Sequence, residues 1–573
     1  MISNSAITAL AFLISCLLAG TKADSPLATT LNGTYQGKYL PGWDQDVFLG
    51  VPFAQPPVGD LRYRWPQSLD SAFDGIKNAT QYGYSCMQYA DNLTMSEDCL
   101  TLNVIRPSSD ASSTPPSSPL PVLVWIYGGG LGVGASVDPQ YNLSGIVRLS
   151  QEINQPILAV SINYRVNHWG FLQTPELLVE GGASNAGLLD QRMALRWIQE
   201  NIAGFGGDSA RVTVWGESAG AQSIAYQMFA YGGRDDGLFS AAILESGGPT
   251  GCPVKDLSYW EVPFENLTRS AGCWEADDRL ACMRSVSQED LYAARQTQEW
   301  QGPLIDGDFL TGYPSQLMPR GEFVSVPLLT GDNTHEGISF SPATYPPNKP
   351  LPKVVTEQEL MTSFLGWRMY DISPLTVKRL LDLYPLEAMC DNDAPQTSAA
   401  NCSLFASKDA QWQRAVAIGG DMVMIAGRRR MCELFSQPSV NQPVYSYRFD
   451  ARPWGSSESQ GSRHFDNVAF SFQNISGLLG PSPENDSHMQ LARQIGKAYI
   501  NFVHYHDPNP SGSRTGERRS YDEENLPYWP RYSSCNPTNM VLDSFGSYIE
   551  PDTYRKEGMA FINSPEVSRE LLG

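Results

Sequence analysis

Residues 212–223 of the chain read VTVWGESAGAQS: an apolar run, a serine between two glycines, and a stretch compatible with a helix. The pattern Gly216-x-Ser218-x-Gly220 at a strand-to-helix junction is typical of a tight turn that presents a serine as a nucleophile. Side chains at the flanking positions would clash with the neighbouring strand or helix, which is why glycine is used there. The helix N-terminus also favours developing negative charge near Ser218. Because the motif is short, an ordinary strand-to-helix turn is the alternative interpretation.

Short apolar runs alternate with amphipathic stretches on both sides of this motif. We expect strands at 122–127, 156–164, 211–215, 239–245, 326–331 and 443–449, and helices at 188–205, 218–231 and 489–506. Nearly continuous apolar strands that alternate with helices indicate a mostly parallel sheet covered on both faces. The sequence therefore predicts an α/β fold with a large central sheet.

A serine hydroxyl needs a base, usually histidine, that is oriented by a carboxylate, and in this architecture the chain order is serine, acid, histidine. His464 follows a strand and the segment WGSSESQGSRH, a loop of the kind that carries catalytic bases, and it is the preferred candidate. The other histidines are less suitable: His168 precedes Ser218, and His335 adjoins the acid candidates. The last three lie in or beside the predicted helix 489–506, namely His488, His504 and His506. For the acid, VPLLTGDNTHEG at 326–337 offers both Asp332 and Glu336, and spacing alone does not choose between them.

The segment VWIYGGGLGVG at 124–134 runs from a predicted strand into Gly128, Gly129 and Gly130. Bare glycine backbones let N–H groups approach a substrate oxygen, so together with the amide of Ala219 they predict an oxyanion hole. A glycine run can also cradle phosphate, but no Gly-x-x-x-x-Gly-Lys-[Ser/Thr] pattern follows. No spaced cluster of cysteine and histidine ligands appears, so we expect neither a metal nor an organic cofactor.

The N-terminus and the cysteines indicate an extracellular destination. Residues 1–23 contain an apolar run and a small-residue cleavage site, which predicts a secretory signal peptide and a mature chain that begins near Asp24. The short cysteine separations predict three local disulfides, Cys86–Cys99, Cys273–Cys282 and Cys390–Cys402. A long-range Cys432–Cys535 bridge would leave Cys252 free. Eight Asn-x-Ser/Thr sequons predict glycosylation, at Asn32, Asn78, Asn92, Asn142, Asn266, Asn401, Asn474 and Asn485.

The formal net charge is −21, which argues against nucleic acid and anionic membranes as partners. After the signal peptide no apolar stretch is long enough to span a membrane. We therefore expect a small-molecule substrate and no stable membrane association.

Taken together, the motifs resemble the type-B carboxylesterase family, which includes the cholinesterases and the large fungal lipases. The resemblance spans most of the mature chain and is carried by EDCLTLNV (97–104), YGGG (127–130), NAGLLDQRMALRWIQENIAGFGGD (185–208), VTVWGESAG (212–220), GDNTHEG (331–337) and GSRHFDN (461–467). It implies an α/β-hydrolase fold and a single domain over residues 24–573.

The resemblance also assigns roles to residues of this chain. The family's acid is the glutamate that precedes glycine in GDNTHEG, which favours Glu336 over Asp332. The implied triad is Ser218, His464 and Glu336, the oxyanion hole is Gly129, Gly130 and Ala219, and Ser246 resembles a serine that supports the triad. The family's first disulfide maps to Cys86–Cys99 and its next short one to Cys273–Cys282.

The segment between Cys86 and Cys99, MQYADNLTMSED, departs from the family in length and polarity. In the related fungal lipases this loop is much longer and forms an apolar lid, and in cholinesterases it carries a tryptophan that holds choline. The sequence therefore predicts a secreted serine carboxylesterase acting on dissolved esters. A triacylglycerol lipase with a remodelled lid is the first alternative, and a non-catalytic binding protein is the second.

Overall fold

The structure is a computed structural model that describes residues 25–572 except 70, 91–92, 109–117, 295–301, 345–352, 368–369, 387–407, 454–460, 475–485 and 511–523. The predicted signal peptide and the predicted Cys390–Cys402 bridge lie outside the described residues. Across the ranges that are described, no helix combines the length and apolar character that a membrane crossing needs.

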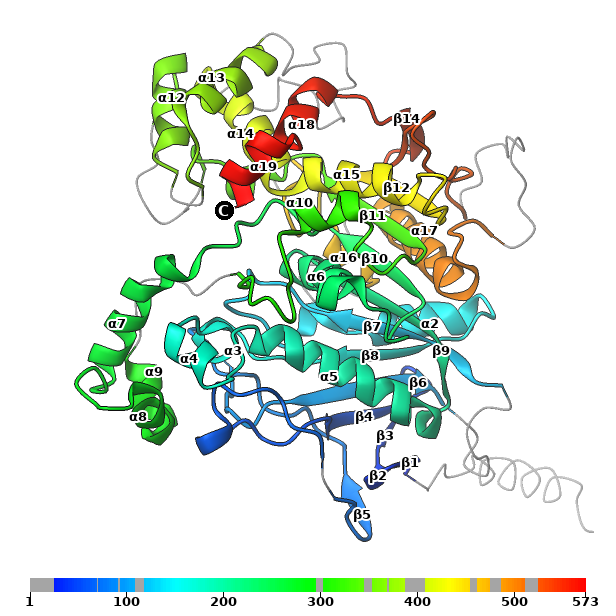
Figure 1. The fold of residues 1–573 in the computed structure, drawn as a ribbon. Coiled ribbons are helices and arrows are strands. Elements are labelled where there is room, and N and C mark those ends of the chain that lie inside the picture. The colour runs from blue at the N-terminus through cyan, green and yellow to red at the C-terminus, as the bar shows by residue number, and fades with distance from the viewer. Residues whose placement is uncertain are drawn as a thin grey trace, which may run out of the picture.

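A large twisted sheet forms the centre of the molecule (Figure 1). Its strand order is β14-β13-β12-β11-β10-β9-β7-β8-β6-β4-β3. The run from β13 to β8 is parallel, and the strands at both edges are antiparallel. The strand bounds are β3 Lys38–Leu40, β4 Gln45–Pro52, β6 Thr101–Pro107, β7 Leu120–Ile126, β8 Leu158–Ile162, β9 Gly207–Glu217, β10 Ala241–Glu245, β11 Leu328–Asn333, β12 Val444–Phe449, β13 Thr538–Leu542 and β14 Tyr548–Pro551.

The central strands are buried on both faces, as their apolar sequences predict. Every residue of β7, β8 and β10 is buried. Along β9, Trp215 stacks on Phe472 and contacts Tyr499, on the side of the sheet covered by α17, whereas Gly216 faces α6. Since successive side chains point to opposite faces, each strand of this region contributes to two packed layers.

The helices include all three that the sequence predicts. The predicted 188–205 corresponds to α5 followed by a short 3-10 helix at Ile202–Phe205, 218–231 to α6, and 489–506 to α17. The helix bounds are α2 Ser144–Glu152, α3 Asn167–Phe171, α4 Pro175–Val179, α5 Ala186–Asn201, α6 Ala219–Gly233, α7 Glu261–Ser270, α8 Arg279–Ser285, α9 Gln288–Ala293, α10 Pro314–Leu317, α11 Gly337–Phe340, α12 Glu357–Leu365, α13 Pro374–Leu383, α14 Trp412–Gly420, α15 Ala426–Phe435, α16 Val468–Ser471, α17 Asp486–Tyr505, α18 Lys556–Ile562 and α19 Pro565–Leu572.

Two smaller apolar clusters lie beside the main core. Helices α12, α13, α14, α18 and α19 pack together in one group, which Figure 1 shows above β11 and β12. Helices α7, α8 and α9 form another group at one side, where the Cys273–Cys282 disulfide joins α8 to the turn that follows α7. A separate three-stranded sheet pairs β1 (Leu27–Thr30), β2 (Gly33–Gln36) and β5 (Ile76–Asn78).

The cysteines correct one prediction. The Cys86–Cys99 and Cys273–Cys282 disulfides are present. The expected Cys432–Cys535 bridge is wrong, because Cys432 is buried on α15 whereas Cys535 lies exposed in the loop before β13. Both therefore remain thiols, as does Cys252.

Candidate active site

Ser218 lies in a tight turn between β9 and α6. Its φ of 56° and ψ of −126° are unusual for a residue other than glycine, and only a constrained turn holds them. A Cβ on Gly216 would lie 2.7 Å from the carbonyl carbon of Gly220, and a Cβ on Gly220 would overlap the Ile126 carbonyl. Both glycines are therefore needed for α6 to pack so closely on the strands. The Ser218 amide donates to the Glu245 carbonyl at 2.9 Å, which anchors the turn to β10.

A hydrogen-bonded chain connects Ser218, His464 and Glu336. His464 Nε2 lies 2.8 Å from Ser218 Oγ, and Nδ1 lies 2.7 Å from Glu336 Oε2. The other carboxylate oxygen of the buried Glu336 accepts from Ser246 Oγ at 2.6 Å and from the Asn333 amide at 2.7 Å. With its acceptor positions occupied in this way, the carboxylate is held in one orientation toward the imidazole.

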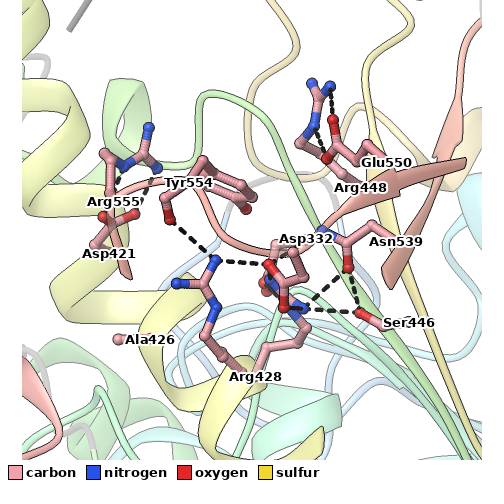
Figure 2. Close-up of polar contacts among 12 residues, drawn as sticks. Asp332, Asp421, Ala426, Arg428, Ser446, Arg448, Asn539, Glu550, Tyr554 and Arg555 are labelled. Carbon is pink, nitrogen blue, oxygen red and sulfur yellow. Dashed lines mark hydrogen bonds and ion pairs between the residues drawn. The ribbon is translucent and has the colours of Figure 1, made fainter. Parts of the chain in front are cut away.

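Asp332, the other acid that the sequence offered, belongs to a different network (Figure 2). Its Oδ2 lies 3.0 Å from Nε of Arg428, whose guanidinium also pairs with Asp552 at 2.8 Å. Arg428 further donates to Ser446 at 2.8 Å and to Asn539 at 3.2 Å. This buried network joins α15 to β11, β12 and β13. Among the described residues, Asp332 makes no hydrogen bond or ion pair with His464.

The loop that carries His464 is fastened to the loop that carries Glu336. The His335 amide donates to the Ser462 carbonyl at 2.8 Å, and the Asn333 side chain donates to the Arg463 carbonyl at 2.5 Å and to Asn467 Oδ1 at 3.0 Å. The His335 side chain joins the same junction, because its Nδ1 accepts from the Ser462 amide at 3.3 Å. Asn333 was not singled out in the sequence, because its partners lie about 130 residues away along the chain.

The glycine loop, residues 128–134, faces the same serine. A Cβ on Gly128 would lie 2.9 Å from Ser218 Cβ, so only glycine permits this approach. Gly129 and Gly130 have φ of 98° and 61°, and their amides have no acceptor among the described residues. Ala219 is the first residue of α6, where an amide has no intrahelical partner. These three amides are available for an anionic oxygen at Ser218.

Glu217 is a further carboxyl group at the site, to which the sequence pattern assigned no role although it adjoins Ser218. It is fully buried, and its Oε1 lies 3.2 Å from His464 Nε2. Burial raises the pKa of Glu217 to about 8. Burial also lowers the pKa of His464, but the carboxylates of Glu217 and Glu336 outweigh it and raise that pKa to about 9. The imidazole is thus flanked by an acidic group at each nitrogen.

The ring of Phe340 packs edge-on against His464, with ring centroids 4.6 Å apart. Only 11% of the His464 side chain is exposed, and Ser218 is 9% exposed. Both side chains therefore lie in a largely water-excluded position, where electrostatic interactions are stronger than in bulk water. Within the described ranges, His, Cys, Asp and Glu side chains form no cluster that could hold a metal ion.

The predicted glycosylation sites differ in accessibility. Asn78 and Asn266 are exposed, Asn32 and Asn142 are half-buried, and Asn474 is only 5% exposed. A glycan on Asn474 is incompatible with this burial. Asn92, Asn401 and Asn485 lie outside the described residues.

The mostly parallel sheet, with a serine turn after its central strand β9 and an acid after β11, defines the α/β-hydrolase fold. Residues 24–558 match the model of the carboxylesterase family, and the chain belongs to that family.

The comparisons with individual proteins agree. The chain is similar to EstA of Aspergillus niger, with a TM-score of 0.78 and 26% identity over 96% of this chain and 100% of that one. It is 31% identical to lipase 4 of Diutina rugosa, over 94% of this chain and 95% of the relative. It is 32% identical to secreted lipase 1 of Botryotinia fuckeliana, over 94% of this chain and 91% of the relative. Ester hydrolysis is the activity that this family membership supports.

Proposed function

We propose that the protein is a secreted serine carboxylesterase that hydrolyses dissolved carboxylic esters through a covalent acyl-enzyme. The observation that carries this proposal is the hydrogen-bonded chain from Ser218 Oγ through His464 to Glu336, with contacts of 2.8 and 2.7 Å. The nucleophile, base and orienting acid that ester hydrolysis requires are thus within reach of one another.

In the proposed mechanism, Ser218 Oγ attacks the ester carbonyl carbon while its proton passes to His464 Nε2. Glu336 stabilises the resulting imidazolium through Nδ1–H, and the amides of Gly129, Gly130 and Ala219 bind the oxyanion. Collapse of the tetrahedral intermediate breaks the ester C–O bond, and His464 returns the proton to the leaving alcohol. Water then repeats these steps on the acyl-enzyme and releases the acid.

The disulfide loop, residues 86–99, supports a dissolved substrate. Only twelve residues separate its cysteines, and they include Asp91, Glu97 and Asp98. A segment so short and polar offers little apolar surface to an oil–water interface. The predicted signal peptide, the sequons and the two disulfides support secretion. A sheet whose strands come from residues 38 to 551 supports one catalytic domain over residues 24–573.

A triacylglycerol lipase is the second candidate, because several relatives of similar length are named lipases. Hydrolysis of p-nitrophenyl esters from acetate to palmitate, alongside emulsified long-chain triglyceride, separates the two. We expect rates that peak at short acyl chains, show no jump above the solubility limit, and vanish in Ser218→Ala.

The other outcomes refute parts of this proposal. A steep rise only with emulsified long chains would establish a lipase in which another segment acts as the lid. No ester hydrolysis by either protein would refute the enzymatic function and favour a binding protein.

A further inference from the structure

The disulfide loop contacts the glycine loop through the side chain of Gln88. Gln88 is fully buried, its Oε1 accepts from the Gly134 amide at 2.8 Å, and its Nε2 donates to the Gly134 carbonyl at 2.8 Å. Nε2 also donates to the Cys86 carbonyl at 3.1 Å. The Gln88 carboxamide thus pairs with both the N–H and the C=O of Gly134, as a residue on a neighbouring antiparallel strand does, and these two hydrogen bonds hold the Gly134 backbone in place.

Gly134 in turn determines the path of the glycine loop. Its φ of 125° favours glycine, and a Cβ there would lie 2.8 Å from the Gly128 carbonyl oxygen, so the two ends of the loop touch. Between them, the Gly129 carbonyl accepts from the amides of Gly132 and Val133, each at 3.1 Å. Because the loop is closed on itself, a displacement of Gly134 would move the amides that face Ser218.

The disulfide loop is fixed near both of its cysteines. Tyr89 Oη lies 3.2 Å from His168 Nε2, and the imidazole stacks on Trp169 with ring centroids 3.7 Å apart. Near the other cysteine, Glu97 forms a buried ion pair with Arg62 at 2.6 Å. These contacts leave Gln88 little freedom to move away from Gly134.

Helix α3 supports both loops through adjacent residues. The Asn167 amide donates to the Leu131 carbonyl of the glycine loop at 2.7 Å, and the next residue, His168, contacts the disulfide loop. The relative position of the two loops is therefore fixed by a third element as well as by Gln88.

We propose that Gln88 is a positioning residue for the oxyanion hole and that the part of the disulfide loop around it, residues 86–89, is a fixed brace of the glycine loop rather than a movable flap. The inference rests on the proposed esterase function and deepens it. Gln88 reaches no reacting atom. It acts by keeping Gly129 and Gly130 in the conformation in which their amides converge on the oxygen at Ser218.

The test replaces Gln88 by methionine, which keeps the side-chain length and removes both hydrogen bonds to Gly134. Removing a single oxyanion donor costs on the order of 10²–10³-fold in kcat, so a displaced loop should cost at least about 10-fold. We expect kcat for p-nitrophenyl butyrate to fall while KM changes little. The inhibition constant of a trifluoromethyl ketone, whose adduct carries an oxyanion, should rise in proportion to the loss of kcat/KM.

Gln45→Met is the matched control. Gln45 is a buried glutamine on β4 that donates to the Ser144 carbonyl at 2.9 Å, and it pairs with Pro107 at the end of the strand opposite to the site. The Gln45→Met variant should lower the melting temperature about as much as Gln88→Met does, and it should leave kcat/KM and the inhibition constant unchanged. A folded Gln88→Met variant with kcat/KM and inhibitor affinity within twofold of wild type would overturn the proposal.

Gln88→Glu provides a second arm if Gln88→Met does not fold. Its carboxylate still accepts from the Gly134 amide, and only the protonated acid can donate to the Gly134 carbonyl. We expect the ratio of variant to wild-type kcat/KM to rise as the pH falls, and a flat ratio near one would overturn the proposal. A wild type inactive on every ester would instead refute the proposed function, and this inference with it.

Discussion

Replacing Glu336 and Asp332 separately tests which carboxylate serves His464. Glu336→Gln preserves the shape of the side chain but removes the charge that faces His464 Nδ1 at 2.7 Å. The imidazolium form of His464 then loses its stabilisation, and the neutral form is no longer held in the tautomer that leaves Nε2 free to accept a proton. The equivalent change in a serine triad costs on the order of 10⁴-fold in kcat, which is about 5.5 kcal/mol of barrier. We expect a fall of about 10³–10⁴-fold with KM nearly unchanged.

Asp332→Asn should instead lower stability. It breaks a buried ion pair with Arg428, and losing one partner of such a pair costs about 3–5 kcal/mol. Arg428 keeps Asp552 at 2.8 Å, so we expect the lower value, about 3 kcal/mol. For a chain of 573 residues, with about 2.1 cal/mol/K of unfolding entropy per residue, that is a fall in Tm of about 2–3 °C.

Both variants are compared with wild type by steady-state hydrolysis of p-nitrophenyl butyrate and by thermal melting. Glu336→Gln should melt like wild type and be nearly inactive, whereas Asp332→Asn should melt earlier and keep kcat within about threefold. The reasoning is refuted if Asp332→Asn loses 10³-fold in kcat without a change in Tm while Glu336→Gln stays active.

Three further variants test the rest of the site. His464 acts as a base only when neutral, so kcat/KM falls as the pH drops through the pKa of His464. Glu217→Gln removes a charge that raises this pKa, so the acidic limb of the pH profile of kcat/KM should move about one pH unit or more lower. A profile that superimposes on that of wild type would mean that Glu217 is uncharged in this pH range. Ser246→Ala removes the 2.6 Å hydrogen bond to Glu336, so the free energy of unfolding measured in urea should fall by about 2 kcal/mol and kcat should fall as well. No change in either quantity would contradict the supporting role of Ser246. Gly216→Ala must open the serine turn and should lower kcat/KM by about 10²-fold. The control Gly42→Ala, whose Cβ would have no atom within 4 Å, should match wild type. A Gly216→Ala variant as active as wild type would contradict the packing argument.

Much of the fold could be predicted because it depends on local pattern. The six expected strands and three expected helices are present, since continuous apolar runs and helical periodicity report burial residue by residue. The serine turn could be predicted for a similar reason, because the glycines at 216 and 220 reflect a steric need that the sequence records directly.

Part of the site could not be predicted by residue reasoning alone. Asp332 and Glu336 follow the same strand four residues apart, and the family resemblance was needed to prefer one. Glu217 carries no pattern that distinguishes it from an ordinary surface glutamate, and its pKa depends on burial. The Cys432–Cys535 pairing failed because cysteine counts contain no information on which thiols meet.

The sequence by itself determined the layered architecture, the serine turn and a short set of candidate residues, because hydrophobic periodicity and glycine placement act over a few neighbouring residues. Only the tertiary structure decided which of them meet: that Glu336 reaches His464 while Asp332 pairs with Arg428, and that Gln88 holds Gly134. These contacts join residues from 46 to 128 positions apart. Their distances follow from how the strands and loops pack in three dimensions, which no local pattern encodes.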